Sequence, residues 1–418
     1  MTVKSWREAT LGEVCDEVNG IIQTGPFGSQ LHQSDYSDVG IPLVMPKDIV
    51  EGKIASDTVA RVSAEHVERL SRHKLSRGDI IYGRRGDIGR QALIRTEQAG
   101  WMCGTGCLRL SLGDSVIDPL FLHYYLSQTD VVNWITNQAV GATMPNLNTG
   151  ILRSVPVRFP PLPIQHRIAG ILSAYDDLIE NSQRRIKILE AMARGLYREW
   201  FVQFRFPGHE HHPRVPSPLG DIPQGWEVKR LPDCVDINPR VTVPRDGDKP
   251  FVPMGCLSND SMLITDIESR SGNSGAKFQN GDTLFARITP CLENGKTGFV
   301  QFLPSADSVG FGSTEFIVLR SRSLSPEFVY LLARSDEFRG VAIKSMSGAT
   351  GRQRVQEKCF DDVPLILPPR ELLDHFIAIV HPSFRLIYKL HLQSQNLRRT
   401  RDLLLPRLLS GQIILEAP

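Results

Sequence analysis

The sequence predicts an α+β protein in which two mixed α/β regions form a pseudo-twofold arrangement, separated by two long antiparallel coiled-coil helices. Three observations support this prediction. One passage occurs twice in the chain, a long amphipathic helical pattern follows each copy, and a region rich in glycine and short apolar segments precedes each copy. A repeat with a period of half the chain indicates two copies of one structural unit.

The repeated passage keeps its register over a long stretch. GATMPNLNTGILRSVPVRFPPLPIQHRIAGIL begins at Gly141, and a divergent copy, GATGRQRVQEKCFDDVPLILPPRELLDHFIAIV, begins 207 residues later at Gly348. Upstream, Asp118-Pro119 and Ser325-Pro326 are separated by the same offset. Each of these pairs puts a helix N-cap residue before a proline, so a helix is expected to begin at each.

Both halves also contain a Gly-Asp turn followed by a short apolar segment and arginine. The first is RGDIIYGRR, residues Arg77–Arg85, and the second is NGDTLFAR, residues Asn280–Arg287. Each is expected to be a turn that leads into a buried β-strand.

Two long helices follow the double prolines. In the first, apolar and small residues recur at alternating steps of four and three, the heptad pattern of a coiled coil. The second helix continues this pattern with polar interruptions, and Pro382 inside it predicts a kink or break near His381. The first pattern comprises Leu172, Tyr175, Ile179, Ser182, Ile186, Leu189, Ala193, Leu196 and Trp200, and the second comprises Leu372, Phe376, Ile379, Ser383, Leu386, Leu390, Leu397, Leu404 and Leu408.

A first helix from about Ile164 to Trp200 would be roughly 55 Å long at about 1.5 Å per residue. The duplication favours an antiparallel pair, because a pseudo-twofold axis would then relate the halves. The Pro-rich segment between them, FRFPGHEHHPRVPSPLGDIPQG, is interpreted as a linker because it ends helices. Its length would also permit a parallel pair.

Composition indicates a globular protein. Of 418 residues, 41% are hydrophobic and 22% are charged, and the net charge of +2 neither requires nor excludes a nucleic-acid partner. Seven scattered cysteines fit a reducing compartment. With no signal peptide and no apolar run of about 20 residues, we expect a cytoplasmic protein without a membrane partner.

Several segments resemble enzyme motifs but lack a residue that the motif requires. CLENGKT lacks the first glycine of a phosphate-binding loop, since Pro290 stands there, and HEHH is followed by Pro213 where a zinc-protease motif needs histidine. Cys103 and Cys107 have no second pair at zinc-finger spacing. We therefore predict no catalytic residue and no metal site in this chain, with the chemistry left to partner subunits.

The order of these parts resembles the specificity subunit of type I restriction-modification systems, and the resemblance covers essentially the whole chain. The segments that carry it are TGPFGSQL from Thr24, SRGDIIYGRRGDIGR from Ser76, VPVRFPPLPIQHRIAGILSAYDDLIE from Val155 and NLRRTRDLLLPRLLSGQI from Asn396. One departure is Ile164-Gln165, where the family usually shows Glu-Gln after the double proline. The departure is expected to alter a local cap or partner contact and not the fold.

The resemblance implies five segments: a first target-recognition domain at 1–163, a spacer helix at 164–203, a linker at 204–222, a second target-recognition domain at 223–369, and a second spacer helix with the C-terminal tail at 370–418. It also implies that each recognition domain recognises one half of a bipartite, asymmetric site in double-stranded DNA. The paired helices would set the half-site spacing and dock two methyltransferase subunits, and restriction subunits would join through that complex. This chain would need no cofactor, whereas partner subunits would use S-adenosylmethionine, and ATP with Mg.

Candidate DNA contacts lie in three kinds of loop: the loop after Thr24, the loops that follow the Gly-Asp strands, and the loops around the repeated Gly-Ala-Thr. Arginine, lysine and amide side chains there could contact phosphates or base edges. Solvated turn arginines, local helix capping and a turn packed on its own domain are the alternatives. The candidates are Gly25, Phe27, Gln30, Arg84, Arg85, Arg90, Thr143, Asn146, Asn148, Arg287, Lys296, Thr350, Arg352, Gln353 and Arg354.

Candidate partner contacts lie on the long helices, where extra apolar and basic positions could dock the helices of another subunit. Packing inside the chain and a solvated basic face are the alternatives. The candidates are Ile186, Leu189, Leu196, Trp200, Leu397, Leu404 and Leu408. For the whole chain, a non-catalytic protein-interaction scaffold and a stand-alone nucleic-acid enzyme with an unrecognised site are the competing functions.

Overall fold

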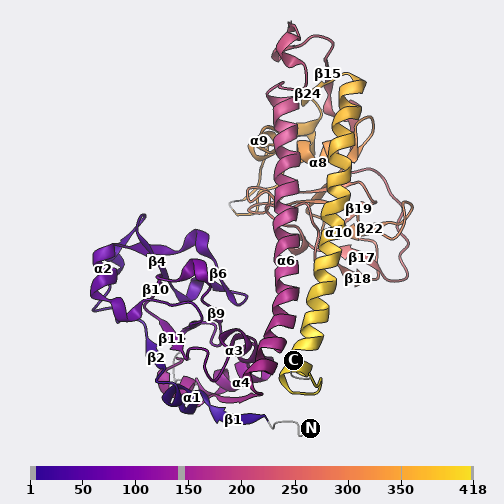
Figure 1. Ribbon diagram of the computed structural model, residues 1–418. Helices are drawn as coiled ribbons and strands as arrows, with labels where there is room; N and C mark the ends of the chain where they lie inside the picture. The colour runs from indigo at the N-terminus through magenta and orange to yellow at the C-terminus, as the bar shows by residue number, and fades with distance from the viewer. Residues whose placement is uncertain (1–5, 140–145, 350, 416–418) are drawn as a thin grey trace. The chain divides into compact units, whose positions relative to one another are not determined.

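The computed structural model describes residues 6–139, 146–349 and 351–415 (Figure 1). The chain divides into two compact units. The first unit comprises Met1–Asp177 and Leu397–Pro418, and the second comprises Leu178–Asn396. Each unit therefore contains one mixed α/β region and a part of each long helix.

The first unit is built around two four-stranded sheets. One has the order β2-β11-β8-β9 with antiparallel neighbours, and the other has the order β10-β4-β7-β3, in which β10 is parallel to β4. The strands of the first sheet are Ile21–Thr24, Cys107–Ser111, Ile80–Gly83 and Gln91–Leu93, and those of the second are Met102–Cys103, Ile41–Val44, Ala60–Val62 and Tyr36–Ser37. Strand β1 (Arg7–Thr10) pairs with β12 (Pro156–Phe159), and the helices of this region are α1 (Leu11–Glu17), α2 (Ala64–Arg69), α3 (Pro119–Leu126), α4 (Thr129–Gln138) and α5 (Thr149–Arg153).

The second unit repeats the order of the first sheet, whereas in its second sheet the fourth strand lies at the other end. Its sheets have the orders β16-β23-β20-β21 and β18-β17-β22-β19, and the second sheet again contains one parallel pair, β17 with β22. The strands of the first sheet are Val235–Ile237, Phe316–Ser321, Thr283–Ala286 and Thr297–Phe299, and those of the second are Glu268–Arg270, Lys249–Val252, Gly310–Gly312 and Ala276–Phe278. Strand β15 (Glu227–Arg230) pairs with β24 (Pro364–Leu367), and the helices are α7 (Leu231–Cys234), α8 (Pro326–Arg334) and α9 (Asp336–Lys344). The duplication predicted from the sequence is thus a duplication of fold.

The predicted helix starts are confirmed in both units. The Asp118 carboxylate accepts a hydrogen bond from the N–H of Phe121 at 2.7 Å, and the Ser325 hydroxyl accepts one from Phe328 at 3.1 Å. Each N-cap satisfies a backbone donor that the first turn of a helix leaves open.

The Gly-Asp turns place a buried carboxylate beside an arginine of the neighbouring strand. Asp79 accepts from the N–H of Ser76 and from Arg109 Nε, both at 2.7 Å. Asp282 accepts from the N–H of Gln279 at 2.7 Å and from two nitrogens of Arg320 at 2.6 and 2.7 Å. Removing one partner of such a buried pair costs about 3–5 kcal/mol, because the other charge is left without compensation. The repeated Gly-Asp is therefore a structural element of the fold.

Two long helices continue from the double prolines (Figure 1). Helix α6 spans Leu162–Tyr197 and ends in a π-helical turn, η6, at Arg198–Val202, while α10 spans Arg370–Leu409. In the second unit, Trp200 of η6, directly after α6, contacts Phe376 near the start of α10, and in the first unit Asp176 of α6 binds Arg401 near the end of α10. The helices are therefore antiparallel, as predicted.

Of the kink or break predicted near His381, a break is wrong, because α10 continues through Pro382 without interruption, and a kink stays a prediction. Proline removes one backbone donor from the helix, but the residues around it hold the turn in place. Val380 and Phe384 on either side are buried, and His381 Nδ1 lies 2.6 Å from a carboxylate oxygen of Glu327 in α8. Tertiary packing thus outweighs the local cost of the proline.

The heptad pattern of α6 is confirmed at its main positions, since Leu172, Ile179, Ser182, Ile186 and Ala193 are buried. The pattern predicted for α10 is wrong by one residue over its first half. Ile379 is 44% exposed; Phe376 and Leu390 of the predicted pattern are buried, and the other buried residues are Leu373, Val380, Phe384 and Ile387. The six buried residues are spaced by three, four, four, three and three, a mean of 3.4 residues, so they lie near the heptad period without its strict alternation.

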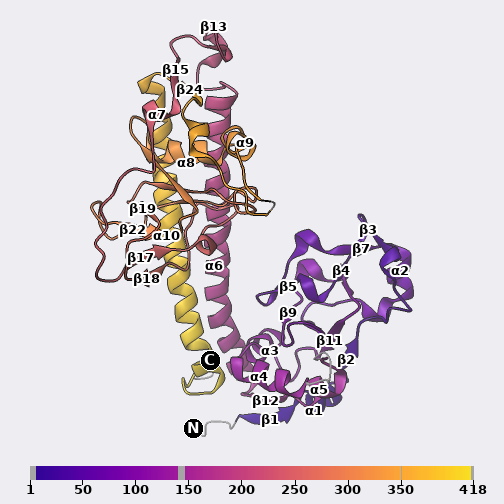
Figure 2. The ribbon, with the colours of Figure 1, turned by 180° about the vertical axis from the view of Figure 1, so that it is seen from behind.

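In the second unit α8 packs against both long helices, which lie side by side in the two views (Figure 2). Phe328 of α8 makes ring contacts with Phe201 at a centroid distance of 5.0 Å and with Phe376 at 6.2 Å. Trp200 and Tyr197 extend this aromatic cluster. The cluster joins the recognition region to the helices through buried apolar area, the main stabilising term in folding.

The segment interpreted as a linker is folded. Strands β13 (Arg214–Ser217) and β14 (Gly220–Pro223) form a hairpin within it. Phe206 and Ile222 are buried in the core of the second unit, and the Phe206 ring packs on Trp226 at 5.5 Å. The segment therefore connects the first helix to β15 along a fixed path.

Candidate nucleic-acid interface

In the first unit, several candidate loops meet at one edge of the β2-β11-β8-β9 sheet. Because β2 and β8 both run antiparallel to β11, their C-terminal ends lie beside its start. The N–H of Gly25 donates to the Cys107 carbonyl at 2.9 Å, and the N–H of Arg84 donates to the Gly106 carbonyl at 2.8 Å. Residues 25–31, 84–90 and 104–106, which we call the first-unit edge, are thus neighbours in space.

The loop after β2 presents an aromatic side chain. Phe27 is 58% exposed, yet its backbone is fixed, because its N–H donates to the Gln30 side chain at 3.1 Å and its carbonyl accepts from the Gln30 N–H at 2.8 Å. Gly25 is buried, and a Cβ there would lie 2.0 Å from the Gly104 carbonyl oxygen. Gly25 and Gln30 therefore shape the loop, and Phe27 is the residue it exposes.

The three arginines of the first-unit edge differ in availability. Arg84 is partly buried and donates through Nε to the Leu147 carbonyl at 3.2 Å. Arg90 is paired with Asp87 at 2.6 Å. Arg85 is exposed and makes no hydrogen bond or ion pair with the described part of the chain, so its guanidinium can meet a phosphate or a base.

The candidates around the first Gly-Ala-Thr lie beside this edge, because the N–H of Leu147 donates to the Arg84 carbonyl at 2.9 Å. Asn148 is the N-cap of α5 and accepts from the N–H of Ile151 at 2.9 Å, which is the capping alternative. The Asn146 side chain is exposed. Thr143 lies outside the described residues.

The second unit has the equivalent edge. The N–H of Arg287, after β20, donates to the Glu315 carbonyl at 3.0 Å, and the N–H of Val355 donates to the Arg287 carbonyl at 2.8 Å. Arg84 has the same two kinds of backbone contact in the first unit. We call residues 238–242, 287–289, 313–315 and 352–355 the second-unit edge.

Three of the candidates in the second unit are held by the protein. Arg287 donates to Glu357 at 2.8 Å, and Arg354 forms a bidentate pair with Glu315, with its shortest contact at 2.7 Å. The Arg354 guanidinium lowers the pKa of the Glu315 carboxyl below its ordinary value. Lys296 Nζ donates to the carbonyls of Met254 and Leu257 at 3.2 and 2.9 Å, so it fixes a neighbouring loop.

The remaining candidates in the second unit flank this edge. Arg352 is exposed, and its side chain has no hydrogen bond or ion pair within the described ranges. Gln353 joins the edge through its backbone, since its N–H donates to the Thr289 hydroxyl at 3.0 Å. Thr350 lies outside the described residues.

The second-unit edge also holds a cavity of about 590 Å³ that the sequence did not reveal. Two of its basic lining residues, Arg240 and Lys277, were not among the candidates. Arg240 follows β16 in a loop with no counterpart in the repeated passage, and Lys277 lies in β19, so no repeated motif marked either residue. The lining residues are Asn238, Pro239, Arg240, Val241, Thr242, Gly275, Ala276, Lys277, Arg287, Thr314, Phe316 and Val318.

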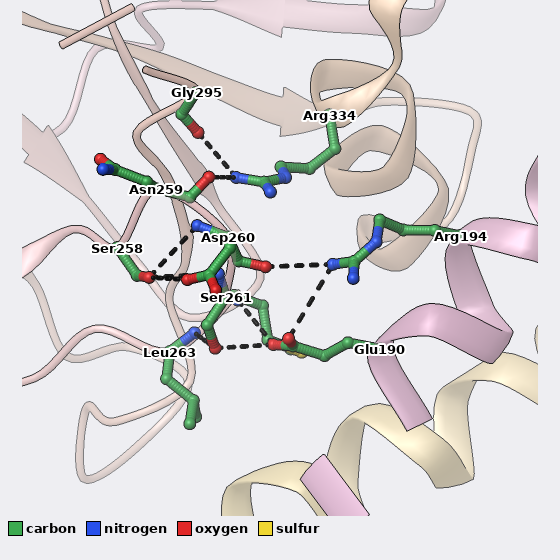
Figure 3. Close-up of polar contacts among 10 residues, drawn as sticks. Glu190, Arg194, Ser258, Asn259, Asp260, Ser261, Leu263, Gly295 and Arg334 are labelled. Carbon is green, nitrogen blue, oxygen red and sulfur yellow. Dashed lines mark hydrogen bonds and ion pairs between the residues drawn. The ribbon is translucent and has the colours of Figure 1, made fainter. Parts of the chain in front are cut away.

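A polar cluster attaches the recognition region of the second unit to α6 (Figure 3). Glu190 of α6 is buried and accepts hydrogen bonds from the Ser261 hydroxyl and the Met262 N–H, both at 2.7 Å. Arg194, one helical turn further, donates to the Asp260 carbonyl at 3.1 Å. Burial raises the pKa of the Glu190 carboxyl above its ordinary value, and these hydrogen bonds offset part of that shift.

Arg334 of α8 completes the cluster from the other side of the loop. Its guanidinium donates to the Asn259 carbonyl at 3.0 Å and to the Gly295 carbonyl at 2.6 Å (Figure 3). The loop around Asp260 is therefore held between two helices of the second unit.

The first unit uses different groups for the same purpose. Gln165 of α6 is fully buried, accepts from the N–H of Asp118 at 2.8 Å and donates to the carbonyls of Val116 and Pro160 at 3.2 and 2.8 Å. The Tyr124 hydroxyl donates to Asp176 at 2.5 Å. Gln165, which follows the departing residue Ile164 and itself matches the family's Glu-Gln, thus fixes the start of α3.

The predicted partner contacts are only partly accessible. Ile186, Trp200 and Leu408 are buried inside the chain, while Leu189, Leu196, Leu397 and Leu404 are partly buried. Their role in partner binding stays a prediction. The apolar side chains that the long helices do expose are Leu178, Ile188, Met192, Ile379, Leu392 and Leu403.

The described residues also show what chemistry the chain can hold. They contain no group of three or more His, Cys, Asp or Glu side chains that could bind a metal ion. All seven cysteines are free. Within the same ranges, no helix has both the length and the apolarity needed to cross a membrane.

Known proteins resemble this chain at the level of sequence. Residues 4–191 match the family described as Type I restriction modification DNA specificity domain. The type I restriction enzyme MjaIX specificity subunit of Methanocaldococcus jannaschii is 25% identical over 397 residues, which cover 91% of this chain and 89% of that protein. The type I restriction enzyme EcoEI specificity subunit of Escherichia coli is 33% identical over 156 residues, which cover 36% of this chain and 26% of that protein.

A solved structure shares the fold. The crystal structure of a type I restriction-modification system S subunit from M. genitalium matches 98% of this chain and 97% of its own, with a TM-score of 0.60 and 15% sequence identity. At this identity the likeness shows that both chains have the same fold.

Proposed function

We propose that this chain is a DNA specificity subunit of a type I restriction-modification system and selects the DNA sequence on which such a complex acts, since residues 4–191 match the specificity-domain family and the MjaIX specificity subunit is 25% identical over 397 residues. Each unit recognises one half of a bipartite site in double-stranded DNA. The two edges differ in sequence, so the half-sites differ and the whole site is asymmetric. The chain performs no catalysis itself.

The observation that carries this proposal is the equivalence of the two edges. In each unit, β-strands end at one edge of the equivalent sheet. Basic side chains are exposed at that edge, Arg85 in the first unit and Arg240 and Arg352 in the second. A duplicated frame with different exposed residues is what two different half-sites require. Charged side chains on loops supply both phosphate contacts and base contacts.

The antiparallel helices support a second part of the proposal, that they set the distance between half-sites. Each helix is continuous and contributes to both units. The polar cluster at Glu190 and the hydrogen bonds of Gln165 attach each recognition region to a helix. A recognition region attached in this way cannot slide along its helix without breaking buried contacts.

We also propose that two methyltransferase subunits dock on the helices and that restriction subunits join through them. Leu178, Ile188 and Met192 of α6 are the strongest docking candidates, because their apolar side chains are exposed on one helix. Large exposed apolar residues on a helix surface are typical of protein interfaces. The partner subunits supply the chemistry, using S-adenosylmethionine, and ATP with Mg.

The test is the methylation pattern that the chain directs in a host without such methylation. The gene is expressed with the methyltransferase gene that neighbours it, with each gene alone as control, and all methylated positions are sequenced. New methylation in one split, asymmetric motif that depends on both genes supports the proposal. No new methylation, with a methyltransferase that is active beside another specificity subunit, would contradict it.

A further inference from the structure

All charged side chains that line the cavity at the second-unit edge are positive. Arg240, Lys277 and Arg287 line it, and none of its lining residues is acidic. Its volume of about 590 Å³ lies within the range of pockets that hold small ligands, about 300–1,000 Å³. A cavity of this kind favours an anionic occupant, because opposite charge is the main long-range attraction available to it.

The basic groups keep donors free for such an occupant. Arg240 is exposed and has no hydrogen bond or ion pair with any residue that the structure describes. Arg287 Nε is buried without an acceptor and is not accessible, so Arg287 contributes only its charge from the cavity wall. Lys277 Nζ donates to the Gly275 carbonyl at 3.2 Å, which leaves two of its three ammonium hydrogens for other acceptors.

The carboxylates next to the cavity are already neutralised. Glu357 accepts from Arg287 at 2.8 Å, and Glu315 accepts the bidentate contact from Arg354. These pairs reduce repulsion toward an anion. The contact with Glu357 also leaves Arg287 unable to present both of its terminal nitrogens as a free fork, so it is poorly suited to the bidentate recognition of a guanine edge.

The walls of the cavity are fixed by the backbone. Asn238 adopts φ 51°, and its side chain accepts from the N–H of Val318 at 2.9 Å while its own N–H donates to the Val318 carbonyl at 2.7 Å. On the opposite wall, a Cβ on Gly275 would lie 1.9 Å from the Gly312 carbonyl oxygen. The basic side chains are thus supported by a shaped frame, which lowers the entropic cost of binding.

We propose that this cavity binds a phosphodiester of the DNA backbone through Arg240 and Lys277, with Arg287 supporting the charge from the cavity wall. The inference rests on the proposed function and assigns a task within it. Contacts of this type position the duplex and add affinity for every DNA sequence, whereas base recognition comes from other residues of the edge. A free nucleotide offers the same phosphate chemistry, so the test separates the two sources.

The experiment uses the full chain in complex with its methyltransferase subunits and compares the double variant Arg240→Ala/Lys277→Ala with the wild type. Binding to a duplex with the methylated motif and to one without it is measured over a range of salt concentrations. Each lost phosphate contact lowers the slope of log affinity against log salt by about 0.9. Because one phosphodiester carries one charge, we expect the slope to fall by about 0.9 and the affinity for both duplexes to fall at least about tenfold at low salt.

Two matched variants control for charge and for folding. Arg230→Ala/Lys344→Ala removes the same charges from exposed positions of the second unit outside the cavity, and its salt slope should equal that of the wild type. Arg240→Lys/Lys277→Arg keeps the charges in the cavity and should retain most of the slope. The sequencing assay for methylated positions should give an unchanged motif with the Ala variant.

Four outcomes would overturn the inference. The first is an unchanged salt slope for the Ala variant, and the second is an equal loss of slope in the control variant. The third is a change of motif in the second half-site, which would make the cavity a base-recognition site. The fourth is binding of adenosine monophosphate to the wild type, measured by calorimetry, without competition with duplex DNA, which would assign the cavity to a free nucleotide. If the wild-type complex itself shows no motif preference, the proposed function fails first, and the two failures are therefore distinct.

Discussion

Gln165 of α6 and Leu373 of α10 occupy equivalent positions, 208 residues apart, four residues after the second proline of each double proline. Gln165 is fully buried and makes two hydrogen bonds to the start of the α3 region and one to the Pro160 carbonyl, whereas Leu373 is buried in an aromatic and aliphatic core. At this position the first unit is thus attached to its helix by a satisfied amide, and the second by apolar packing.

The comparison shows which parts of a duplicated fold are free to change. The order of the sheet that carries the edge, the buried Asp–Arg pair and the N-caps are the same in both units, because each satisfies buried backbone or charge. The residues between sheet and helix can change together, provided that every buried polar group keeps a partner. The exposed edges have no such constraint, and there the units differ most: Phe27 in one, the basic cavity in the other.

The largest loss of stability is expected where apolar side chains attach the second unit to α10. Phe376→Ala should lower the free energy of unfolding of the second unit by about 3–5 kcal/mol, because it removes a fully buried ring that contacts Phe201 and Phe328. Urea unfolding followed by tryptophan fluorescence measures this, since Trp200 lies in the same cluster.

Ile379→Ala on the same helix is the matched control for this prediction. Ile379 is exposed, so its substitution should cost less than about 1 kcal/mol. A cost for Ile379→Ala as large as that for Phe376→Ala would contradict the packing face of α10 described above.

Giving each of the two equivalent positions, 165 and 373, the kind of side chain found at the other should lower the free energy of unfolding in both cases. Gln165→Leu leaves one N–H and two carbonyls without their partner and should cost about 2–4 kcal/mol. Leu373→Gln buries an amide in an apolar site and should cost about 1–3 kcal/mol. Gln183→Leu, at an exposed position of α6, should stay within about 0.5 kcal/mol of the wild type in the same unfolding measurement.

The Glu190 attachment should depend on pH. Because burial raises the pKa of this carboxyl, the folded chain binds its proton more readily than the unfolded chain does, and the protonated form adds stability that is lost as pH rises through the raised pKa. Glu190→Gln removes this dependence. The difference in unfolding free energy between variant and wild type should therefore shift in favour of the variant from below pH 4.5 toward pH 7. A difference that is flat over this range would contradict the burial of a charged Glu190.

The smallest effect on stability is expected at the first-unit edge. Phe27→Ala should change the free energy of unfolding by less than about 0.5 kcal/mol, because the ring is mostly exposed. If the ring contacts DNA, affinity for the methylated duplex should fall by about 1–3 kcal/mol, the range measured for aromatic contacts with bases. Titration of the assembled complex with labelled duplex measures this, and a change in stability without a change in affinity would assign Phe27 to the fold.

The sequence predicted the parts that repeat. The duplicated passage, the N-caps at Asp118 and Ser325 and the heptad pattern of α6 all follow from local patterns that one sequence displays. The phase of α10 was predicted wrongly, because Leu372, Ile379 and Leu386 are as apolar as the residues that are buried. Only the packing of Phe376 and Phe384 against other segments selects the buried face.

The availability of the candidate arginines depends, for a related reason, on contacts that the sequence does not show, and their binding to DNA stays a prediction. Arg85 and Arg352 are exposed and unpaired among the described residues, but Arg90, Arg287 and Arg354 meet carboxylates that are not their sequence neighbours or that a turn brings close. Sequence alone cannot rank arginines by their partners. Arg240 and Lys277 come from segments far apart in the chain, and only the fold brings them to one cavity.

The most direct measurement replaces residues 1–163 with the corresponding segment of a related specificity subunit that has a different known motif. The hybrid chain is expressed with the same methyltransferase gene, and all methylated positions are sequenced. If each unit recognises its own half-site, one half of the motif changes to that of the donor while the other half stays the same. A change in both halves, or in neither half with active methylation, would contradict the assignment of one half-site to each unit.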